Sequence, residues 1–271
     1  MILKDLEVKM SNNNIESILA LFSKEQFNEA LDAIQGLIIN DPNDALLFNI
    51  RGACYAGLDQ LNLAKENYEK AIALHPGYAK AHYNLAGALY ELNDFDDSIQ
   101  SYQNALAIES DYAEAHNNLG IALKDLRQLD AAVKSFKKAI AIKPDYIEAH
   151  YSLGATFQEL GQLDDAVKSY KEVVNIEPDF AEIHNNLGVI LNKLNQKDAA
   201  LKSLERAVAI KPDFAEAHNN LGNVLKELDQ HGEAVKCYEK AIAIKPDFAE
   251  AYFNLAGVLI DIGRIGEAVK S

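Results

Sequence analysis

The sequence predicts an all-α solenoid built from a repeated helical hairpin, and three observations support this prediction. The prolines recur at intervals of 34 residues or twice 34: Pro42, Pro76, Pro144, Pro178, Pro212 and Pro246. Within each interval the apolar residues follow the helical period twice, and nothing is inserted between intervals. A fixed period of this length is typical of supersecondary units that stack on their neighbours, so we expect one continuous array.

Alignment on this period gives the boundaries of the units. Residues 1–10 lie outside the register as an N-terminal extension, and residues 11–44 form a diverged first unit. Six units of 34 residues follow: 45–78, 79–112, 113–146, 147–180, 181–214 and 215–248. Residues 249–271 begin an eighth unit whose second helix is truncated. Since repeat arrays normally end in polar caps, we expect either a fragment of a longer protein or an end covered by another molecule or another copy of the chain.

Residues 113–146 illustrate the two helices of one unit. Apolar residues recur at helical spacing first around Leu119 and then around Phe136, and a break at residues 127–130 separates the two runs. Pro144 ends the second helix, because proline lacks an amide proton and disfavours helix in the residue before it. Gly120 is small where the two helices must approach closely. Each unit is therefore predicted to be a helical hairpin.

Charged residues recur with the period as well. An aspartate stands three residues before a glutamate where the first helix should begin, at Asp111/Glu114, Asp145/Glu148, Asp179/Glu182, Asp213/Glu216 and Asp247/Glu250, and this spacing predicts a capping box. On the second helices, an aspartate precedes a lysine by four residues at Asp130/Lys134, Asp164/Lys168 and Asp198/Lys202. These pairs predict a solvated outer face with helix-stabilising ion pairs.

The unit beginning Ala113-Glu-Ala-His-Asn-Asn-Leu-Gly, with Leu123, Ala132, Phe136, Ala139 and Pro144, resembles a tetratricopeptide repeat (TPR). The resemblance covers residues 45–271, and residues 11–44 resemble a diverged capping repeat. It implies an antiparallel helix pair in each unit and a right-handed superhelix whose first helices line a concave groove.

The composition excludes several classes of protein. The formal charge is −15, from 41 acidic and 26 basic residues, which disfavours a nucleic-acid partner because phosphate binding needs a basic face. No apolar run approaches the roughly 18 residues of a membrane span, so no membrane partner is expected. The two cysteines, Cys54 and Cys237, form neither a disulfide framework nor a metal-binding pair. We expect a cytoplasmic protein.

The chain shows no catalytic, cofactor-binding or metal-binding motif. Five histidines recur with the period, at His82, His116, His150, His184 and His218, but equivalent residues of stacked hairpins lie about 10 Å apart, too far to share a metal ion. They occupy a place where TPR units commonly have an aromatic residue, so a packing role is favoured. Residues 52–57 have the glycine spacing of a phosphate-binding loop without its lysine and its serine or threonine. We therefore predict no enzyme activity for these residues.

One polar position of the first helices indicates a binding surface. An amide or hydroxyl recurs there at Asn84, Asn118, Ser152, Asn186, Asn220 and Asn254. An asparagine amide offers a donor and an acceptor, so it can bind the backbone of an extended peptide without recognising side chains. The row resembles the asparagine ladder in the TPR superhelix of O-linked N-acetylglucosamine transferase, where similar residues hold the substrate backbone. Asparagine is common at this position in the family, so a merely tolerated polar residue is the alternative.

The neighbouring positions should set specificity. Apolar or stacking surface is expected from Tyr83, Tyr151 and Phe253, and a longer polar track from Asn117, Asn185 and Asn219. Carboxylates outnumber lysines among the expected groove residues, which favours a neutral or basic ligand.

The functional hypothesis is a non-catalytic scaffold for protein–protein interaction that binds an extended polypeptide in the groove. One alternative is the N-terminal, substrate-recruiting arm of a larger enzyme such as a glycosyltransferase. The other is a scaffold that self-associates through its uncapped C-terminal end.

Overall fold

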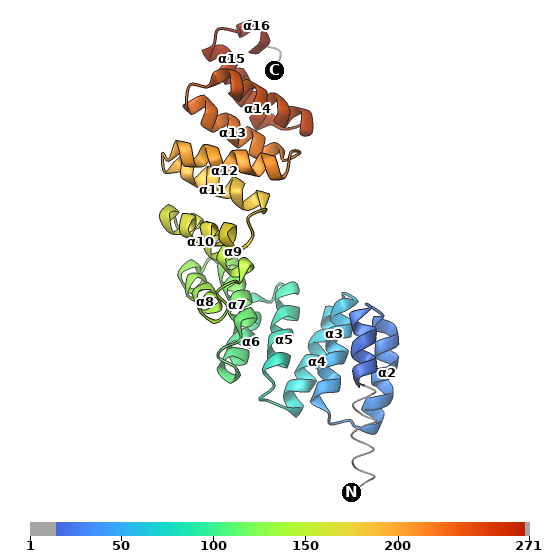
Figure 1. Cartoon of the computed structure of the whole chain (residues 1–271). Helices are drawn as coiled ribbons and strands as arrows, with labels where there is room; N and C mark the ends of the chain where they lie inside the picture. The colour runs from blue at the N-terminus through green and yellow to red at the C-terminus, as the bar shows by residue number, and fades with distance from the viewer. Residues whose placement is uncertain (1–14, 269–271) are drawn as a thin grey trace. The chain divides into compact units, whose positions relative to one another are not determined.

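The computed structural model describes residues 15–268, and all regular secondary structure in this range is α-helical (Figure 1). The predicted extension at residues 1–10 lies outside the described residues, as do residues 269–271 of the last unit. None of the described helices is both long and apolar enough to cross a lipid bilayer. The all-α fold class predicted from the sequence is confirmed.

The helices follow one another in antiparallel pairs, two to each interval of 34 residues. Residues 15–23 are helical and precede α2 (Phe27–Asn40). The next pairs are α3 (Ala45–Gly57) with α4 (Leu61–Leu74), α5 (Ala79–Glu91) with α6 (Phe95–Ile108), and α7 (Ala113–Asp125) with α8 (Leu129–Ile142). They are followed by α9 (Ile147–Glu159) with α10 (Leu163–Ile176), α11 (Ala181–Lys193) with α12 (Lys197–Ile210), α13 (Ala215–Glu227) with α14 (His231–Ile244), and α15 (Ala249–Asp261) with α16 (Ile265–Ala268).

The contacts divide the chain into two compact units, the first ending at Pro144 and the second beginning at Asp145. The structure thus has two units where the periodicity predicted one continuous array, and each unit is described by itself. Within each unit the first helix of a hairpin packs on the hairpin before it.

The first helices form the inner row of each unit. In the first unit α3 contacts α5 and α5 contacts α7, and in the second unit α11 contacts α13 and α13 contacts α15. The second helices of neighbouring described hairpins do not contact one another to the same extent. A stack in which only one row of helices is in close contact curves toward that row, so the first helices lie on the inner side within each unit.

The break predicted inside each hairpin is a tight turn with one residue in the left-handed region. Arg127, with φ of 61°, occupies this place between α7 and α8, and the amide of Gln128 then donates to the carbonyl of Leu123 at 2.8 Å. Equivalent residues with positive φ are Glu25, Asp59, Asn93, Gly161, Asn195, Asp229 and Gly263. This bond satisfies a carbonyl at the end of the first helix, which is the usual function of a left-handed C-cap.

The predicted capping boxes are wrong. The N-cap residues of α7, α9, α11, α13 and α15 are the aromatic residues Tyr112, Tyr146, Phe180, Phe214 and Phe248, none of which makes a side-chain cap bond. The aspartates stand one residue too early. The glutamates still serve the helix start, because the carboxylates of Glu182 and Glu216 accept their own backbone N–H groups, which contributes to lowering the pKa of both. Among α2–α15, only α3 has a side-chain cap, from Asp44 to the amide of Leu46 at 2.8 Å.

A glycine in the first helix lies against a large side chain of the second helix in most hairpins. Phe136 is fully buried, and a Cβ added to Gly120 would lie 2.6 Å from its ring. Gly52, Gly154, Gly188 and Gly222 have the same relation to Tyr68, Tyr170, Leu204 and Tyr238. The close approach predicted at Gly120 is therefore confirmed and sets the spacing of the two helices.

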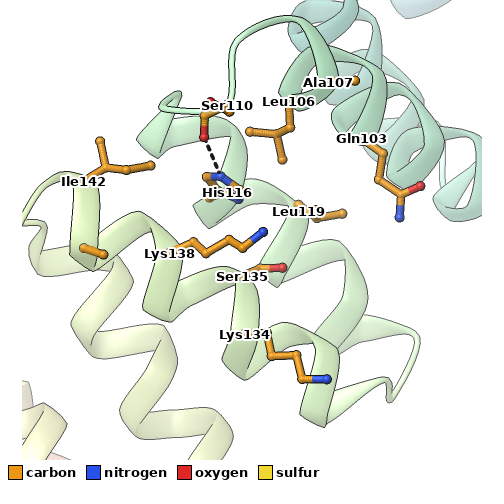
Figure 2. Close-up of a pocket in the computed structure, with 11 residues that line it drawn as sticks. Gln103, Leu106, Ala107, Ser110, His116, Leu119, Lys134, Ser135, Lys138 and Ile142 are labelled. Atoms are coloured by element: carbon orange, nitrogen blue, oxygen red, sulfur yellow. Dashed lines mark hydrogen bonds between the residues drawn. The ribbon is translucent and has the colours of Figure 1, made fainter.

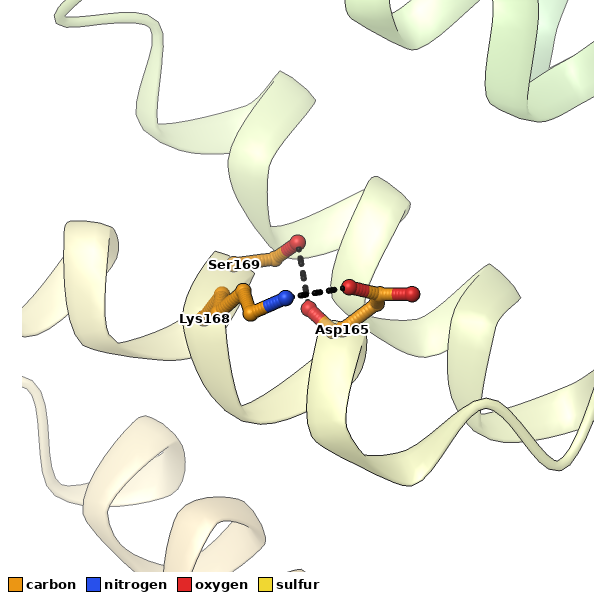
Figure 3. A network of polar contacts seen from close by, with 3 residues as sticks. All are labelled: Asp165, Lys168 and Ser169. Carbon is orange, nitrogen blue, oxygen red and sulfur yellow. Dashed lines mark hydrogen bonds and ion pairs between the residues drawn. The ribbon is translucent and has the colours of Figure 1, made fainter.

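The outer face of the second helices is charged and exposed, as expected, but one ion pair differs from the prediction. Lys168 Nζ binds Asp165 Oδ1 at 2.8 Å, and Figure 3 shows this contact beside the bond from Ser169 Oγ to the Asp165 carbonyl. The predicted partner was Asp164, four residues before the lysine. Asp165 lies three residues before the lysine, a spacing that also places two side chains on one helix face.

Candidate functional site

The six residues of the predicted row are all half-buried and lie on the first helices. Asn84 on α5 and Asn118 on α7 belong to the first unit. Ser152, Asn186, Asn220 and Asn254, on α9, α11, α13 and α15, belong to the second. Because the first helices form the inner row of each unit, these polar side chains are partly accessible on the inner side.

The amides of the row are fixed by hydrogen bonds between neighbouring hairpins. In the first unit, Asn84 Nδ2 donates to Asn49 Oδ1 at 3.0 Å. Asn118 Nδ2 in turn donates to the Tyr83 hydroxyl at 3.0 Å. Each acceptor lies 35 residues before its donor, so the bond joins one hairpin to the hairpin before it.

The second unit repeats this arrangement. Asn220 Nδ2 donates to Asn185 Oδ1 at 2.9 Å, and Asn254 Nδ2 donates to Asn219 Oδ1 at 3.0 Å. A side-chain amide has two N–H groups and an oxygen with two lone pairs, so these bonds use only part of its capacity. The row therefore joins the hairpins while each amide keeps groups that can bind another chain.

The asparagines expected to lengthen the polar track do not lie at the surface. Asn117, Asn185 and Asn219 are only 3%, 8% and 1% exposed. Asn185 and Asn219 accept the bonds from the next hairpin, and Asn219 Nδ2 also donates to Glu250 Oε1 at 3.0 Å. Successive residues of an α-helix differ by about 100° in direction, so the residue before each row asparagine points toward the neighbouring hairpin. We correct their expected role from ligand contact to support of the row.

The three flanking aromatic residues differ in how far they are exposed. Phe253 is 79% exposed and Tyr151 is 39% exposed. Tyr83 is half-buried, with its ring centroid 4.8 Å from that of Tyr112. The Lys80 ammonium lies 4.6 Å from the Tyr83 centroid and donates to the Tyr112 hydroxyl at 2.9 Å. This lysine–tyrosine cluster was not predicted, because its members come from different positions of two units.

Several carboxylates of the first helices are already paired. Lys211 Nζ binds Glu182 at 2.8 Å, and this hydrogen bond is the main cause of the lowered pKa of Glu182. Lys245 binds Glu216 at 3.2 Å in the next hairpin. These exposed contacts reduce the negative field that the residue count suggested.

A second row of contacts between hairpins lies at the C-terminal ends of the first helices. Tyr90 donates its hydroxyl proton to Asp125, and this bond is the largest contribution that raises the pKa of Tyr90 to about 12. Asn192 donates to Glu227 at 3.1 Å, and Lys226 Nζ lies 3.3 Å from Asp261. In each case the carboxylate lies 35 residues after its partner. We call these three pairs the helix-end contacts.

The repeated histidines bind the backbone. Nε2 lies 2.9–3.1 Å from the carbonyl oxygen six residues earlier at His82, His116, His184 and His218. Since a carbonyl oxygen only accepts, Nε2 must donate, which fixes the tautomer. No group of three or more His, Cys, Asp or Glu side chains within residues 15–268 is placed to hold a metal ion.

A pocket of about 610 Å³ lies beside His116 on the side of the second helices, entirely within the first unit. Figure 2 shows His116 bonded to the Ser110 carbonyl, with Lys134 and Lys138 extending from α8. Leu106, Leu119 and Ile142 supply apolar walls. His116 Nδ1 is buried without a partner in the described structure, but so is that of His82, so this feature belongs to the repeat and not to the pocket.

His116 should make stability depend on pH. Burial lowers the pKa of His116 below its ordinary value of 6.5, an effect the Ser110 carbonyl opposes and Lys138 supports. The neutral ring is then the folded form, so its contribution is complete above about pH 6.5 and is lost as the pH falls through the lowered pKa. We expect the stability advantage of the wild type over His116→Gln, measured by urea unfolding, to shrink between pH 7 and pH 5. A constant difference would contradict this assignment.

The family comparison agrees with the fold. A model described as TPR repeat matches residues 86–127, 123–161, 157–195, 190–229 and 222–263. Two models described as tetratricopeptide repeat match residues 67–100 and 46–78. The chain belongs to the tetratricopeptide repeat family.

Curated relatives match over short segments. The peroxisomal targeting signal receptor of Kluyveromyces lactis is 35% identical over 65 residues, 24% of this chain and 12% of that protein. The receptor of the same name from Saccharomyces cerevisiae is 29% identical over 80 residues, 30% of this chain and 13% of that protein. Protein STIP1 homolog of Dictyostelium discoideum is 32% identical over 79 residues, 29% of this chain and 14% of that protein. These matches therefore cover about an eighth of each relative.

Solved structures of TPR proteins share the fold. A TPR protein segment from Cytophaga hutchinsonii has a TM-score of 0.75 at 16% identity, with 89% of this chain and 98% of that chain covered. MamA has a TM-score of 0.56 at 29% identity, with 59% and 93% covered. YrrB, described as a TPR protein with an unusual peptide-binding site, has a TM-score of 0.61 at 23% identity, with 69% and 96% covered. The resemblance of the asparagine row to that of O-linked N-acetylglucosamine transferase stays a prediction.

Proposed function

We propose that this chain is a non-catalytic scaffold that binds an extended polypeptide along the inner row of first helices. The observation that supports this function best is the row of half-buried asparagines, each held in place by a bond to the preceding hairpin while part of its amide remains available. Side chains that are fixed before binding lose less entropy when the ligand arrives. Such amides suit the recognition of a peptide backbone, which offers one donor and one acceptor at most residues.

The spacing of the row fits this ligand. Neighbouring hairpins place equivalent residues about 10 Å apart, and an extended chain rises about 3.3 Å per residue. One amide then meets about every third residue of the ligand. The printed names of the relatives, receptors for a peroxisomal targeting signal and a TPR protein with a peptide-binding site, support a peptide as the ligand. The absence of a catalytic motif in the sequence supports a binding role.

The test uses the second unit, where three asparagines follow one another. The full chain is used to select binders from a displayed library of random twelve-residue peptides, and the affinity of a labelled winner is measured by fluorescence anisotropy. Asn186→Ala together with Asn220→Ala should weaken binding roughly tenfold to thirtyfold. This corresponds to about 1 kcal/mol for each lost hydrogen bond.

Two controls separate binding from stability. Asn185→Ala removes the buried acceptor of Asn220, so it should cost stability of about 1 kcal/mol, as Asn220→Ala does, but reduce affinity less. Asn175→Ala changes an exposed asparagine of α10 and should alter neither quantity. Equal affinity of the double variant and the wild type for every selected peptide would reject the asparagine row as the binding site.

A further inference from the structure

Glu91 lacks the contact that its position has elsewhere in the array. The three helix-end contacts join a side chain of one hairpin to the carboxylate 35 residues later, at Asp125, Glu227 and Asp261. Glu91 is the equivalent carboxylate on α5, and the residue 35 positions before it is Ala56. A methyl group cannot donate a hydrogen bond or balance a charge. Glu91 is exposed and makes no hydrogen bond or ion pair within the part of the chain described.

A pocket lies beside this carboxylate. It has a volume of about 260 Å³ and is lined by Gly87, Tyr90, Glu91, Tyr102, Asn118 and Ile121, all in the first unit. Gly87 opens it, because a Cβ added there would meet nothing closer than the Tyr102 hydroxyl at 3.8 Å. The Tyr90 hydroxyl is already bonded to Asp125, so Tyr90 contributes mainly its ring. We call this space the Gly87 pocket.

The second unit shows what such a place can hold. Gly257 and Asp261 on α15 have the same spacing of four residues as Gly87 and Glu91 on α5. Lys226 of the preceding hairpin lies there, with its Nζ 3.3 Å from Asp261. A Cβ built on Gly257 would lie 3.3 Å from the same Nζ, so the ammonium group rests against bare backbone. This is an internal example of a cation between a glycine and a carboxylate one turn later.

We propose that the Gly87 pocket binds a lysine or arginine side chain of the polypeptide that lies along the inner row. This inference rests on the proposed function and assigns it one specificity-determining subsite. Ala56 leaves Glu91 unneutralised where Lys226 neutralises Asp261, and the ligand supplies the missing cation. Asn118, a member of the asparagine row, also lines the pocket, so a peptide backbone bound to the row lies within reach of it.

The chemistry of the pocket favours a cation with an apolar stem. The aromatic rings of Tyr90 and Tyr102 offer surface to the methylene groups, and a tyrosine face attracts a positive charge. Glu91 supplies an acceptor for the charged end. An acidic side chain would meet Glu91 and the neighbouring Asp125, and like charges placed together disfavour binding.

The experiment supplies the cation from within the protein. In Ala56→Lys the new ammonium should reach Glu91 as Lys226 reaches Asp261, whereas Ala56→Met adds a side chain of similar length without charge. Ala56→Lys should therefore raise the melting temperature relative to Ala56→Met, and Glu91→Gln should abolish this difference. Absence of any dependence on Glu91 would overturn the proposed ammonium position without reference to a peptide.

Peptide selection tests the ligand. The full chain should enrich lysine or arginine at one position of the displayed library, and replacement of that residue by norleucine in a synthetic peptide should lower affinity about tenfold. In Glu91→Gln and in Ala56→Lys the two peptides should bind equally, while Ala56→Met should keep the tenfold preference. Selection of peptides with no basic position would overturn the Gly87 pocket alone. Failure to select any peptide would overturn the proposed function together with this inference.

Discussion

Gly120→Ala should lower the free energy of unfolding by about 2 to 3 kcal/mol, because the added methyl group overpacks the interior of a hairpin. Its Cβ would lie 2.6 Å from Phe136 Cε1, closer than carbon atoms approach without displacement. Phe136 is fully buried, so its ring cannot turn aside without disturbing the neighbouring helices. Urea unfolding followed by circular dichroism at 222 nm would measure the loss.

Gly36→Ala is the matched control for this substitution. Gly36 lies in the interior of α2, and a Cβ added there meets nothing within 4 Å. Since alanine favours helix over glycine by roughly 0.5 to 1 kcal/mol, this variant should be more stable than the wild type. The same chemical change should thus have opposite signs at the two sites. Loss of stability at Gly36, or none at Gly120, would contradict the assigned packing.

Tyr238→Ala should cost about 3 to 5 kcal/mol, since it removes a fully buried ring from the interior of the hairpin of α13 and α14. Tyr238→Phe keeps the ring and removes only the hydroxyl, which donates to Asn223 Oδ1 at 2.8 Å. The smaller change should cost about 1 kcal/mol. Burial raises the pKa of Tyr238 well above its usual range, so the phenol stays protonated under the conditions of measurement.

The pair of substitutions separates packing from hydrogen bonding. Equilibrium unfolding of both variants, with Tyr151→Phe as a more exposed comparison, gives the two contributions by difference. If Tyr238→Phe were as destabilising as Tyr238→Ala, the hydroxyl and not the ring would dominate, contrary to the packing against Gly222.

The helical hairpins could be predicted because each signal recurs with every unit. Prolines end the second helices, and the apolar period changes phase at the turn, where Arg127 and its equivalents adopt positive φ. The starts of the first helices were less predictable. An aspartate followed by a glutamate suits a capping box, but the turn places Tyr146 or Phe180 at the N-cap and leaves the aspartate outside the helix.

The candidate site was predicted in part. Repetition alone revealed the asparagine row, but it did not show which groups bind the amides, because those partners lie 35 residues away on another hairpin. For the same reason the burial of Asn117 was missed. The Gly87 pocket arises where the repetition fails, at Ala56 and Gly87. A comparison of equivalent positions that searched for exceptions would have found both residues.

The bonds between hairpins imply that the repeats are not interchangeable, although their sequences are alike. Tyr90 requires Asp125 in the following hairpin, Lys226 requires Asp261, and Asn254 requires Asn219 in the preceding one. Shuffling the hairpins would juxtapose mismatched neighbours and leave carboxylates and amides without complements. Linear order is thus written into the side chains, which discourages out-of-register pairing while a chain of near-copies folds.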